Sequence, residues 1–347
     1  MPDNAPDVAA KRLRLHQLST VDARAAFAAD VTRGLQAQPK KLFPKYFYDE
    51  LGSLLFDAIC LLPEYYLTRA EDEIFARHAA QIIAATGHAE LTLLELGSGS
   101  ATKTRRLIEA LLARQPQLLY RPIDISVAAL ETSARVLLQS YPALSVEAYA
   151  GDYDTALAHL QRAAAKRTNE PDGTHTLALF LGSNVGNFER GEAEDFLRGV
   201  RGVLRTGDAL LLGADLKKET ARLVAAYDDA LGITAAFNLN LLARLNREFA
   251  ADFDLRAFRH VARYDAAHGR IELYLESQRA QIVCLPALDL TINFAAGELL
   301  HTENSHKYDL AELDELAART GFARTETWMD ERRQFSSNLL VATGSAA

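Results

Sequence analysis

The sequence is poor in cysteine and contains no long apolar run. Its only cysteines, Cys60 and Cys284, are too few for a disulfide framework and lack the spacing of zinc ligands. Both stand in apolar surroundings, so we expect buried free thiols. No segment approaches the length of a membrane span, and residues 1–18 mix charged residues where a signal peptide has an apolar segment. We therefore expect a cytoplasmic protein without a membrane partner.

Basic residues are outnumbered by acidic ones. The 347 residues include 38 Lys and Arg against 46 Asp and Glu, which gives a formal net charge of −8. A nucleic-acid partner requires a basic surface that neutralises phosphates, so this balance argues against one. The length and a hydrophobic content of 49% are sufficient for a full apolar core. We expect a monomeric protein whose partner is a small molecule.

Short apolar segments alternate with helical patterns from residue 90 onward. This alternation is typical of βαβ units around a parallel sheet. The segment 174–181 is apolar along most of its length, which predicts a central strand buried on both faces. The expected strands are 92–96, 119–123, 145–150, 177–181 and 209–213, and the expected helices are 104–114, 127–140, 154–166 and 191–203.

Both ends of the chain have a different character. Aromatic segments at 43–49 and 61–69 contain proline, which disfavours a regular helix, so we expect a packed loop or lid there. Thr68 followed by Glu71 is typical of a capping box that starts a helix. The other expected elements are helices at 21–36, 227–247 and 310–320, antiparallel strands at 258–264, 270–278, 281–285 and 288–294, and a strand-like tail at 338–343.

These patterns predict an α/β fold with two parts. The core spans residues 69–236, and a second α+β lobe is built from both chain ends, residues 1–68 and 237–347. We expect the core to carry a parallel sheet and the second lobe to carry the antiparallel strands.

A glycine-rich turn follows the first expected strand of the core. Gly97 and Gly99 have no Cβ, so the backbone can approach a ligand closely at the end of the strand. The dinucleotide pattern is incomplete, because Thr102 occupies the third glycine position, and the spacing of a phosphate-binding P-loop is absent. The turn therefore indicates a nucleotide-like ligand without the usual phosphate motifs.

Acidic residues follow the next two expected strands. Asp124 ends the first of them, and Asp152 with Tyr153 follows the other. A carboxylate accepts hydrogen bonds from ribose hydroxyls but repels phosphate, which favours S-adenosylmethionine (SAM) as the ligand. Asp124 would then bind the ribose, Asp152 the adenine amino group, and Tyr153 would pack on the ring. The alternative is that both aspartates only cap the helices that follow them.

Motifs between about residues 44 and 307 occur in an order shared with one family. They are Tyr46-Phe47-Tyr48-Asp49, Leu62-Pro63-Glu64-Tyr65-Tyr66, the segment from Glu95 to Thr104, Phe180-Leu181-Gly182-Ser183, Gly186-Asn187-Phe188, Tyr227-Asp228-Asp229 and Thr302-Glu303 with Ser305-His306-Lys307. The chain thereby resembles the L-histidine Nα-methyltransferases of ergothioneine biosynthesis. The resemblance implies a Rossmann-like SAM-dependent methyltransferase core and three methyl transfers to the α-amino group of histidine, giving hercynine.

The resemblance also implies two groups of site residues. One group binds the substrate. In it, Asn187 and Tyr227 form the catalytic pair that holds the amine and carboxylate, and Glu303 and Ser305 hold the imidazole through its nitrogens. The implied SAM positions are Gly97, Lys103, Asp124, Asp152 and Tyr153. The implied substrate positions are Tyr48, Tyr65, Asn187, Tyr227, Glu303 and Ser305.

Other readings of these residues remain open. Tyr65 can be an ordinary core aromatic, Asn187 a turn residue, and the strand face of Glu303 and Ser305 a solvated surface. No metal is expected, because His301, Glu303 and His306 do not follow the H-E-x-x-H pattern.

Two departures from the family pattern bear on the substrate. Leu273 stands where methionine is common, and Asn184 where threonine is common. Another amino acid as substrate is therefore one alternative function. A non-catalytic SAM-binding regulator is an alternative from a different class, and Thr102 with the strand-end carboxylates disfavours a nicotinamide enzyme.

Overall fold

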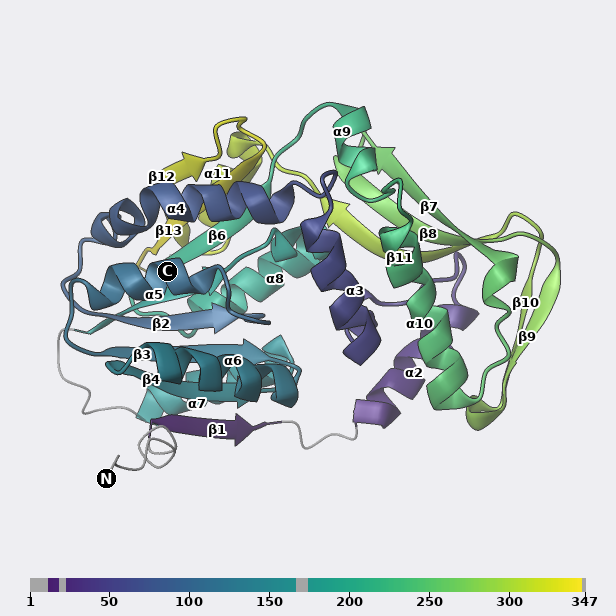
Figure 1. Ribbon diagram of the computed structural model, residues 1–347, viewed down its shortest axis with the longest axis horizontal. Coiled ribbons are helices and arrows are strands. Elements are labelled where there is room, and N and C mark those ends of the chain that lie inside the picture. Colours follow the sequence, from purple (N-terminus) through teal and green to yellow (C-terminus); the bar gives the residue numbers. More distant parts are fainter. Residues whose placement is uncertain (1–11, 19–22, 167–173, 345–347) are drawn as a thin grey trace, which may run out of the picture.

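An eight-stranded sheet forms the larger part of the molecule (Figure 1). The computed structural model describes residues 12–18, 23–166 and 174–344, so the expectation for residues 1–18 lies mostly outside the described residues. The strand order is β1-β4-β3-β2-β5-β6-β13-β12, in which β1 to β6 run parallel and β13 pairs antiparallel with both β6 and β12. The strands are β1 (Leu13–Gln17), β2 (Leu91–Leu96), β3 (Leu118–Asp124), β4 (Leu144–Ala150), β5 (His175–Phe180), β6 (Ala209–Asp215), β12 (Phe322–Met329) and β13 (Phe335–Ala342).

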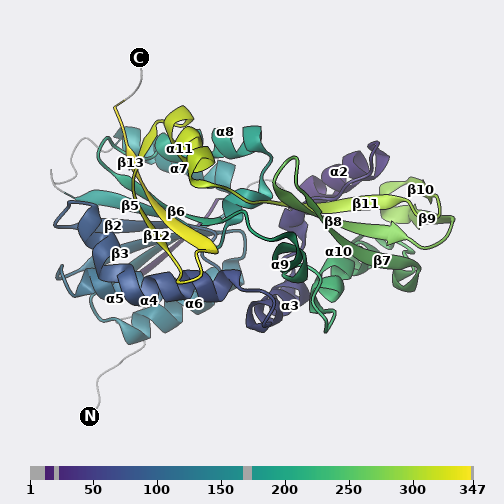
Figure 2. The ribbon, with the colours of Figure 1, turned by 90° about the horizontal axis from the view of Figure 1, so that it is seen from above.

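Helices cover both faces of this sheet (Figure 2). One face carries α4 (Leu67–Ala85), α5 (Thr104–Leu112) and α6 (Val127–Ser140), and the other carries α7 (Tyr153–Lys166), α8 (Arg190–Arg201) and α11 (Leu310–Arg319). Because side chains alternate along a strand, Leu93 and Leu94 of β2 pack into the two different apolar clusters. Burial on both faces explains why β2 and β6 are mostly apolar. The predicted parallel α/β core and its central strand, β5, are confirmed.

Antiparallel strands form a second lobe beside the large sheet (Figure 1). Strands β7 (Phe258–Asp265), β8 (Arg270–Ser277) and β11 (Leu299–His306) make a three-stranded sheet, and β9 (Gln281–Leu285) pairs with β10 (Leu290–Phe294). The antiparallel prediction is therefore confirmed. The helical segments of this part are α2 (Ala23–Gln36), η1 (Pro44–Tyr46), α3 (Glu50–Leu61), α9 (Thr220–Ala225), α10 (Ile233–Phe249), η3 (Leu255–Ala257) and η4 (Pro286–Leu288).

The predicted boundaries of the second lobe are wrong at both ends of the chain. Strand β1 pairs with β4, and β13 pairs with β6 while β12 pairs with β13, so all three strands belong to the large sheet. Helix α11 packs on the face that carries α7 and α8. Pairing partners more than 100 residues apart leave no local pattern, so hydrophobic periodicity alone does not assign these segments to a sheet.

One predicted capping box and one predicted helix start are also wrong. Helix α4 begins at Leu67 without a side-chain cap, and Glu71 instead accepts a hydrogen bond from the Gly182 amide. Helix α10 begins only at Ile233, because the Asp229 carboxylate accepts the amides of Ile233 and Thr234 at 2.9 and 2.7 Å. Tyr227 therefore lies on an irregular segment before the helix.

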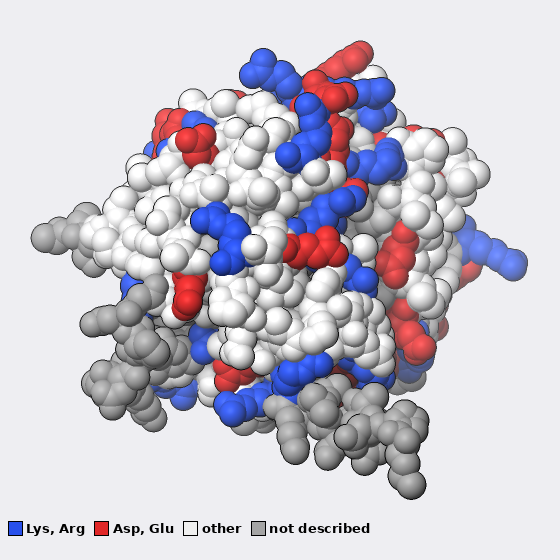
Figure 3. Space-filling model, turned by 60° about the vertical axis from the view of Figure 1, so that its left-hand side comes forward, with Lys and Arg blue, Asp and Glu red and all other residues white. Residues whose placement is uncertain are grey.

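The surface charges and the two cysteines do not indicate a particular function. Figure 3 shows basic and acidic side chains interspersed over one face of the molecule. Cys60 and Cys284 are free and half-buried. Among the described residues, none of the helices combines the length and apolarity needed to cross a membrane.

Candidate active site

The predicted site residues lie where the order of the large sheet reverses. The chain runs from β2 outward to β3 and β4, and then returns to place β5 on the other side of β2. Ligands of open α/β sheets bind beyond the carboxyl ends of the strands at such a point. Gly97 follows β2 and Gly182 follows β5, and both have the positive φ angles, +74° and +72°, that glycine adopts without strain.

Asp124 fixes the glycine-rich turn against the end of β3. Its carboxylate accepts the amide of Gly99 through one oxygen and the amide of Ser126 through the other, both at 2.9 Å. A Cβ on Gly97 would lie 2.5 Å from the Tyr153 hydroxyl, so a side chain has no room there. Asp124 and Tyr153 thus converge on the turn.

Asp152 caps the helix that follows it, which is the alternative to adenine binding. Its side chain is exposed and accepts the Thr155 amide at 2.8 Å, in the first turn of α7. Tyr153, the next residue, packs its ring beside Phe180 and Phe196, with centroid separations of 5.8 and 5.2 Å. Asp124 likewise accepts the amide of Ser126, two residues further on, so both aspartates have local backbone partners.

Lys103 connects the glycine-rich turn with the turn after β5. Its ammonium forms an ion pair with Glu71, which is fully buried and also accepts the Gly182 amide at 2.9 Å. A Cβ on Gly182 would lie 3.6 Å from the Lys103 Nζ atom. Sequence reasoning missed Glu71, because its spacing from Thr68 resembles a capping box.

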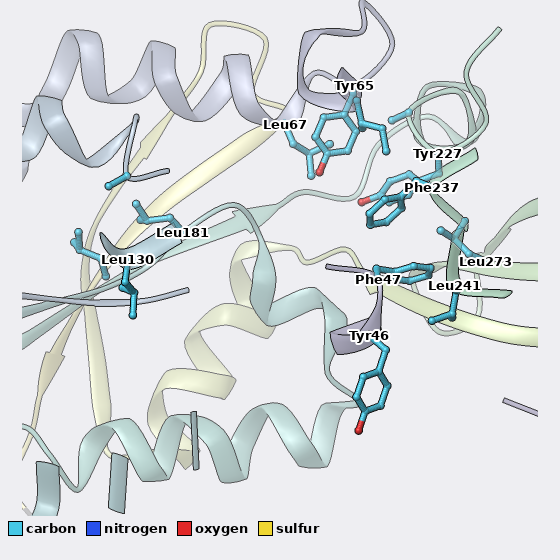
Figure 4. Packing of buried hydrophobic residues seen from close by; sticks show 14 of the residues in the cluster. Tyr46, Phe47, Tyr65, Leu67, Leu130, Leu181, Tyr227, Phe237, Leu241 and Leu273 are labelled. Carbon is cyan, nitrogen blue, oxygen red and sulfur yellow. The ribbon is translucent and has the colours of Figure 1, made fainter. Parts of the chain in front are cut away.

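A cavity beside these turns brings together all the residues predicted for the substrate. Figure 4 shows the side chains of Tyr65 and Tyr227 next to Phe237. The Asn184 side chain also lines the cavity, and its Nδ2 atom lies 3.5 Å from where a Cβ of Gly97 would stand, so the two predicted sites adjoin. The lining includes Tyr48, Phe56, Tyr65, Gly182, Asn184, Asn187, Tyr227, Thr234, Phe237, Leu273, Glu303 and Ser305.

A second cavity contains none of these residues. It opens near the amino ends of the core strands and is lined by Glu90, Gln115, Arg121 and Asp208 among others. Within the described part of the chain, no group of three or more His, Cys, Asp or Glu side chains is placed to hold a metal ion.

Strand β11 divides its side chains between the cavity and the opposite face. Glu303 and Ser305 line the cavity and are 9% and 3% exposed, so the alternative of a solvated strand face is wrong. Asn304 points the other way and donates to the Glu189 carboxylate. This alternation confirms the shared face predicted for Glu303 and Ser305.

Close packing against β11 positions Asn187. The segment η2 (Asn184–Asn187) contains Gly186, where a Cβ would lie only 2.7 Å from the His306 carbonyl oxygen. Glycine is therefore required at this contact, and it lets η2 lie directly on β11. Asn187 consequently lines the same cavity as Glu303.

A buried hydrogen-bonded cluster extends behind the cavity. The hydroxyls of Tyr227 and Ser305 are 2.8 Å apart, and the Lys307 ammonium donates to both at 2.8 Å. Lys307 also pairs with Asp215 at 2.9 Å, and both of these side chains are completely buried. Sequence reasoning assigned no role to Lys307 or Asp215, although Asp215 ends a buried strand at the same edge as the predicted sites.

Burial raises the pKa of Glu303 to about 7 from the ordinary value of 4.5, and nearby Lys307 opposes that rise. The folded chain therefore binds this proton more tightly than the unfolded chain. The stability that Glu303 contributes is greatest below its unfolded pKa and is lost as the pH rises through its folded pKa.

We expect Glu303→Gln to stabilise the ligand-free protein at pH 8. The gain in the free energy of unfolding should be on the order of 2–3 kcal/mol and should shrink toward pH 5, because the wild-type side chain is then protonated in the folded state. Urea unfolding at the two pH values measures it. Glu131→Gln, at an exposed position of α6, is the control. An equal effect at both pH values would contradict the buried charge as its cause.

Comparisons with known proteins give a consistent result. The sequence model of a family described as histidine-specific, SAM-dependent methyltransferases matches residues 27–342. The chain is 43% identical to a histidine N-alpha-methyltransferase of Mycolicibacterium smegmatis, over 93% of this chain and 97% of that protein. It is 44% identical to the protein of the same name from Mycobacterium tuberculosis, over 90% and 94%. It is 31% identical to ergothioneine biosynthesis protein 1 of Neurospora crassa, over 84% of this chain and 32% of that protein.

Proposed function

The chain belongs to the family of SAM-dependent, histidine-specific methyltransferases, and we propose that it trimethylates the α-amino group of L-histidine to hercynine, a step of ergothioneine biosynthesis. The observation that carries the proposal is the buried Glu303 carboxylate, which shares one cavity with Ser305, Asn187 and Tyr227. High identity along most of the chain supports the same substrate.

The residues around the glycine-rich turn fit SAM. When bound, SAM would supply a methyl group to the amine, whose lone pair would form the new N–C bond. The electrons of the broken S–C bond would stay on sulfur, which would leave as the neutral thioether S-adenosylhomocysteine. Lys103 would hold the carboxylate of SAM, since an ammonium has three donors and Glu71 accepts from it. Asp124 would accept the ribose hydroxyls, because each of its oxygens has a second lone pair beside the backbone hydrogen bond. Asp152 and Tyr153 would lie at the adenine.

The cavity residues would orient the amino acid toward the methyl donor. Asn187 and Tyr227 would hold its amine and carboxylate, and Tyr65 and Tyr48 would enclose it. The attacking nitrogen needs a free lone pair, so it must lose a proton before each transfer. Methyl transfer disperses charge, so the main contribution of the chain is alignment of the reactants. Alignment can lower the activation free energy by about 7–11 kcal/mol.

Glu303 and Ser305 would select the side chain of the substrate. A buried carboxylate that lacks a donor partner is costly, so the cavity favours a side chain that brings N–H donors. The imidazole ring has two nitrogens at fixed separation, which can meet Glu303 and Ser305 together. Aliphatic side chains would leave the Glu303 carboxylate without a donor.

The first test is the stoichiometry and position of methylation. Purified protein with histidine and excess SAM should release three S-adenosylhomocysteines per histidine, and tandem mass spectrometry should place all three methyl groups on the α-nitrogen. A ring-methylated product would contradict the orientation. Calorimetry separates the regulator alternative, which predicts binding of SAM but of neither histidine nor its methylated forms.

A further inference from the structure

Lys307 is a fully buried ammonium that touches two residues of the substrate cavity. It follows β11 directly, and its three N–H donors are matched by three acceptors: Asp215 at 2.9 Å, Tyr227 at 2.8 Å and Ser305 at 2.8 Å. An ammonium can only donate, so both hydroxyl oxygens must accept from it. The orientation of the two hydroxyls is thereby restricted.

The hydroxyls of Tyr227 and Ser305 also bond each other at 2.8 Å. Two hydroxyl hydrogens are available in this pair, and only one can lie between the two oxygens. The other hydrogen must point elsewhere, and both residues line the cavity. The cluster therefore presents one O–H donor to a ligand, at either Tyr227 or Ser305.

We propose that Lys307 is a positioning residue, which locks the Tyr227 and Ser305 hydroxyls as a coupled pair with a single O–H donor for the amino acid. The inference rests on the proposed function, in which Tyr227 meets the carboxylate and Ser305 the ring. If Tyr227 donates to the carboxylate, Ser305 donates to Tyr227 and offers only a lone pair to the ring. The ring nitrogen facing Ser305 must then carry a hydrogen, so the two ends of the substrate are recognised together.

Lys218 provides a matched control within the same cluster. Its ammonium lies 2.6 Å from the Asp215 carboxylate and 2.6 Å from the Tyr66 hydroxyl, but it does not line the cavity. Asp215 also accepts from Tyr66 at 2.9 Å. Removing either lysine therefore leaves Asp215 paired with the other one, and neither variant buries a bare carboxylate.

The test compares Lys307→Met with Lys218→Met. Lys307→Met should raise the KM for histidine about 10–50-fold, since the hydroxyl pair loses its shared donor, while the Kd for SAM changes less than about twofold. Lys218→Met should change the KM for histidine less than about threefold. In a Tyr227→Phe background the effect of Lys307→Met should largely disappear, because the coupled pair of hydroxyls no longer exists.

Equal effects of the two lysine variants, or an undiminished effect in the Tyr227→Phe background, would overturn the positioning role. Should Lys307→Met not fold, Lys307→Gln serves instead: a KM within about twofold of wild type would overturn the proposal, and a clear rise would support it. Wild-type protein that binds SAM but no histidine would instead refute the proposed function itself.

Discussion

Replacing Glu303 with Ala should raise the KM for histidine about 100-fold while SAM binding is retained. A hydrogen bond to a charged group contributes about 1.5–3 kcal/mol, and the loss is largest where water cannot substitute. Glu303 is 9% exposed and lines the cavity with Ser305, so the imidazole would lose a buried partner. Steady-state kinetics with varied histidine and calorimetry with SAM measure the two quantities.

The matched variants are Glu303→Gln and Glu272→Gln. Glu303→Gln keeps the shape and removes the charge, so its KM should lie between those of wild type and Glu303→Ala. Glu272 of β8 stands opposite Asn304, on the sheet face that points away from the cavity, and its replacement should leave the KM unchanged. An unchanged KM in Glu303→Ala would sink the assignment of Glu303 to the substrate ring.

The second large effect is expected at Gly97. Alanine there would place its Cβ 2.5 Å from the Tyr153 hydroxyl and would adopt a φ of +74°, which is strained for any residue with a side chain. We expect Gly97→Ala to weaken SAM binding by about 100-fold or more, of which the left-handed strain accounts for roughly tenfold. Calorimetric titration with SAM or S-adenosylhomocysteine gives the affinity.

Tyr153→Phe separates the steric part of this effect from the backbone strain. Without the hydroxyl, the next atom of the ring, Cζ, lies 3.6 Å from the Cβ position, an ordinary contact. The double variant Gly97→Ala/Tyr153→Phe should therefore bind SAM more tightly than Gly97→Ala alone, although Tyr153→Phe by itself brings no gain. Absence of this recovery would show that Tyr153 does not limit the space at Gly97.

Stability and binding should change in opposite directions at Glu303. The same burial that raises its pKa to about 7 makes the charged form unfavourable in the ligand-free protein. Glu303→Gln is thus expected to stabilise the fold at pH 8 and to weaken histidine binding. Such opposition is typical of functional sites, where a strained or desolvated group is retained for its ligand.

Local patterns were sufficient to predict the core of the fold. Strand β2 and the turn at Gly97 are contiguous in sequence, and burial on both faces made β5 and β6 recognisable as apolar runs. The alternation of Glu303 and Ser305 on one strand face is likewise a period-two pattern. These features depend on residues that are close neighbours along the chain.

Long-range contacts could not be predicted in the same way. Strand β1 lies beside β4, and Lys307 contacts Tyr227 and Asp215. Both arrangements join segments that are far apart in sequence, so no periodicity predicts them. The apolar pattern predicts a helix from residue 227, but α10 starts only at Ile233. The reason is that the Asp229 carboxylate accepts the amides of Ile233 and Thr234. The roles of Asn187 and Tyr227 came from the family resemblance and stay predictions until their variants are assayed.

Substrate choice is the central claim, and a competition assay tests it most directly. The protein is incubated with SAM and an equimolar mixture of the twenty amino acids, and mass spectrometry follows the consumption of each one. We predict that histidine is consumed first and accumulates as its Nα-trimethyl form. Its kcat/KM should be at least about 100-fold above that for tryptophan or tyrosine, because those rings cannot bind both Glu303 and Ser305. Preferential methylation of another amino acid would contradict the account and would direct attention to Leu273 and Asn184.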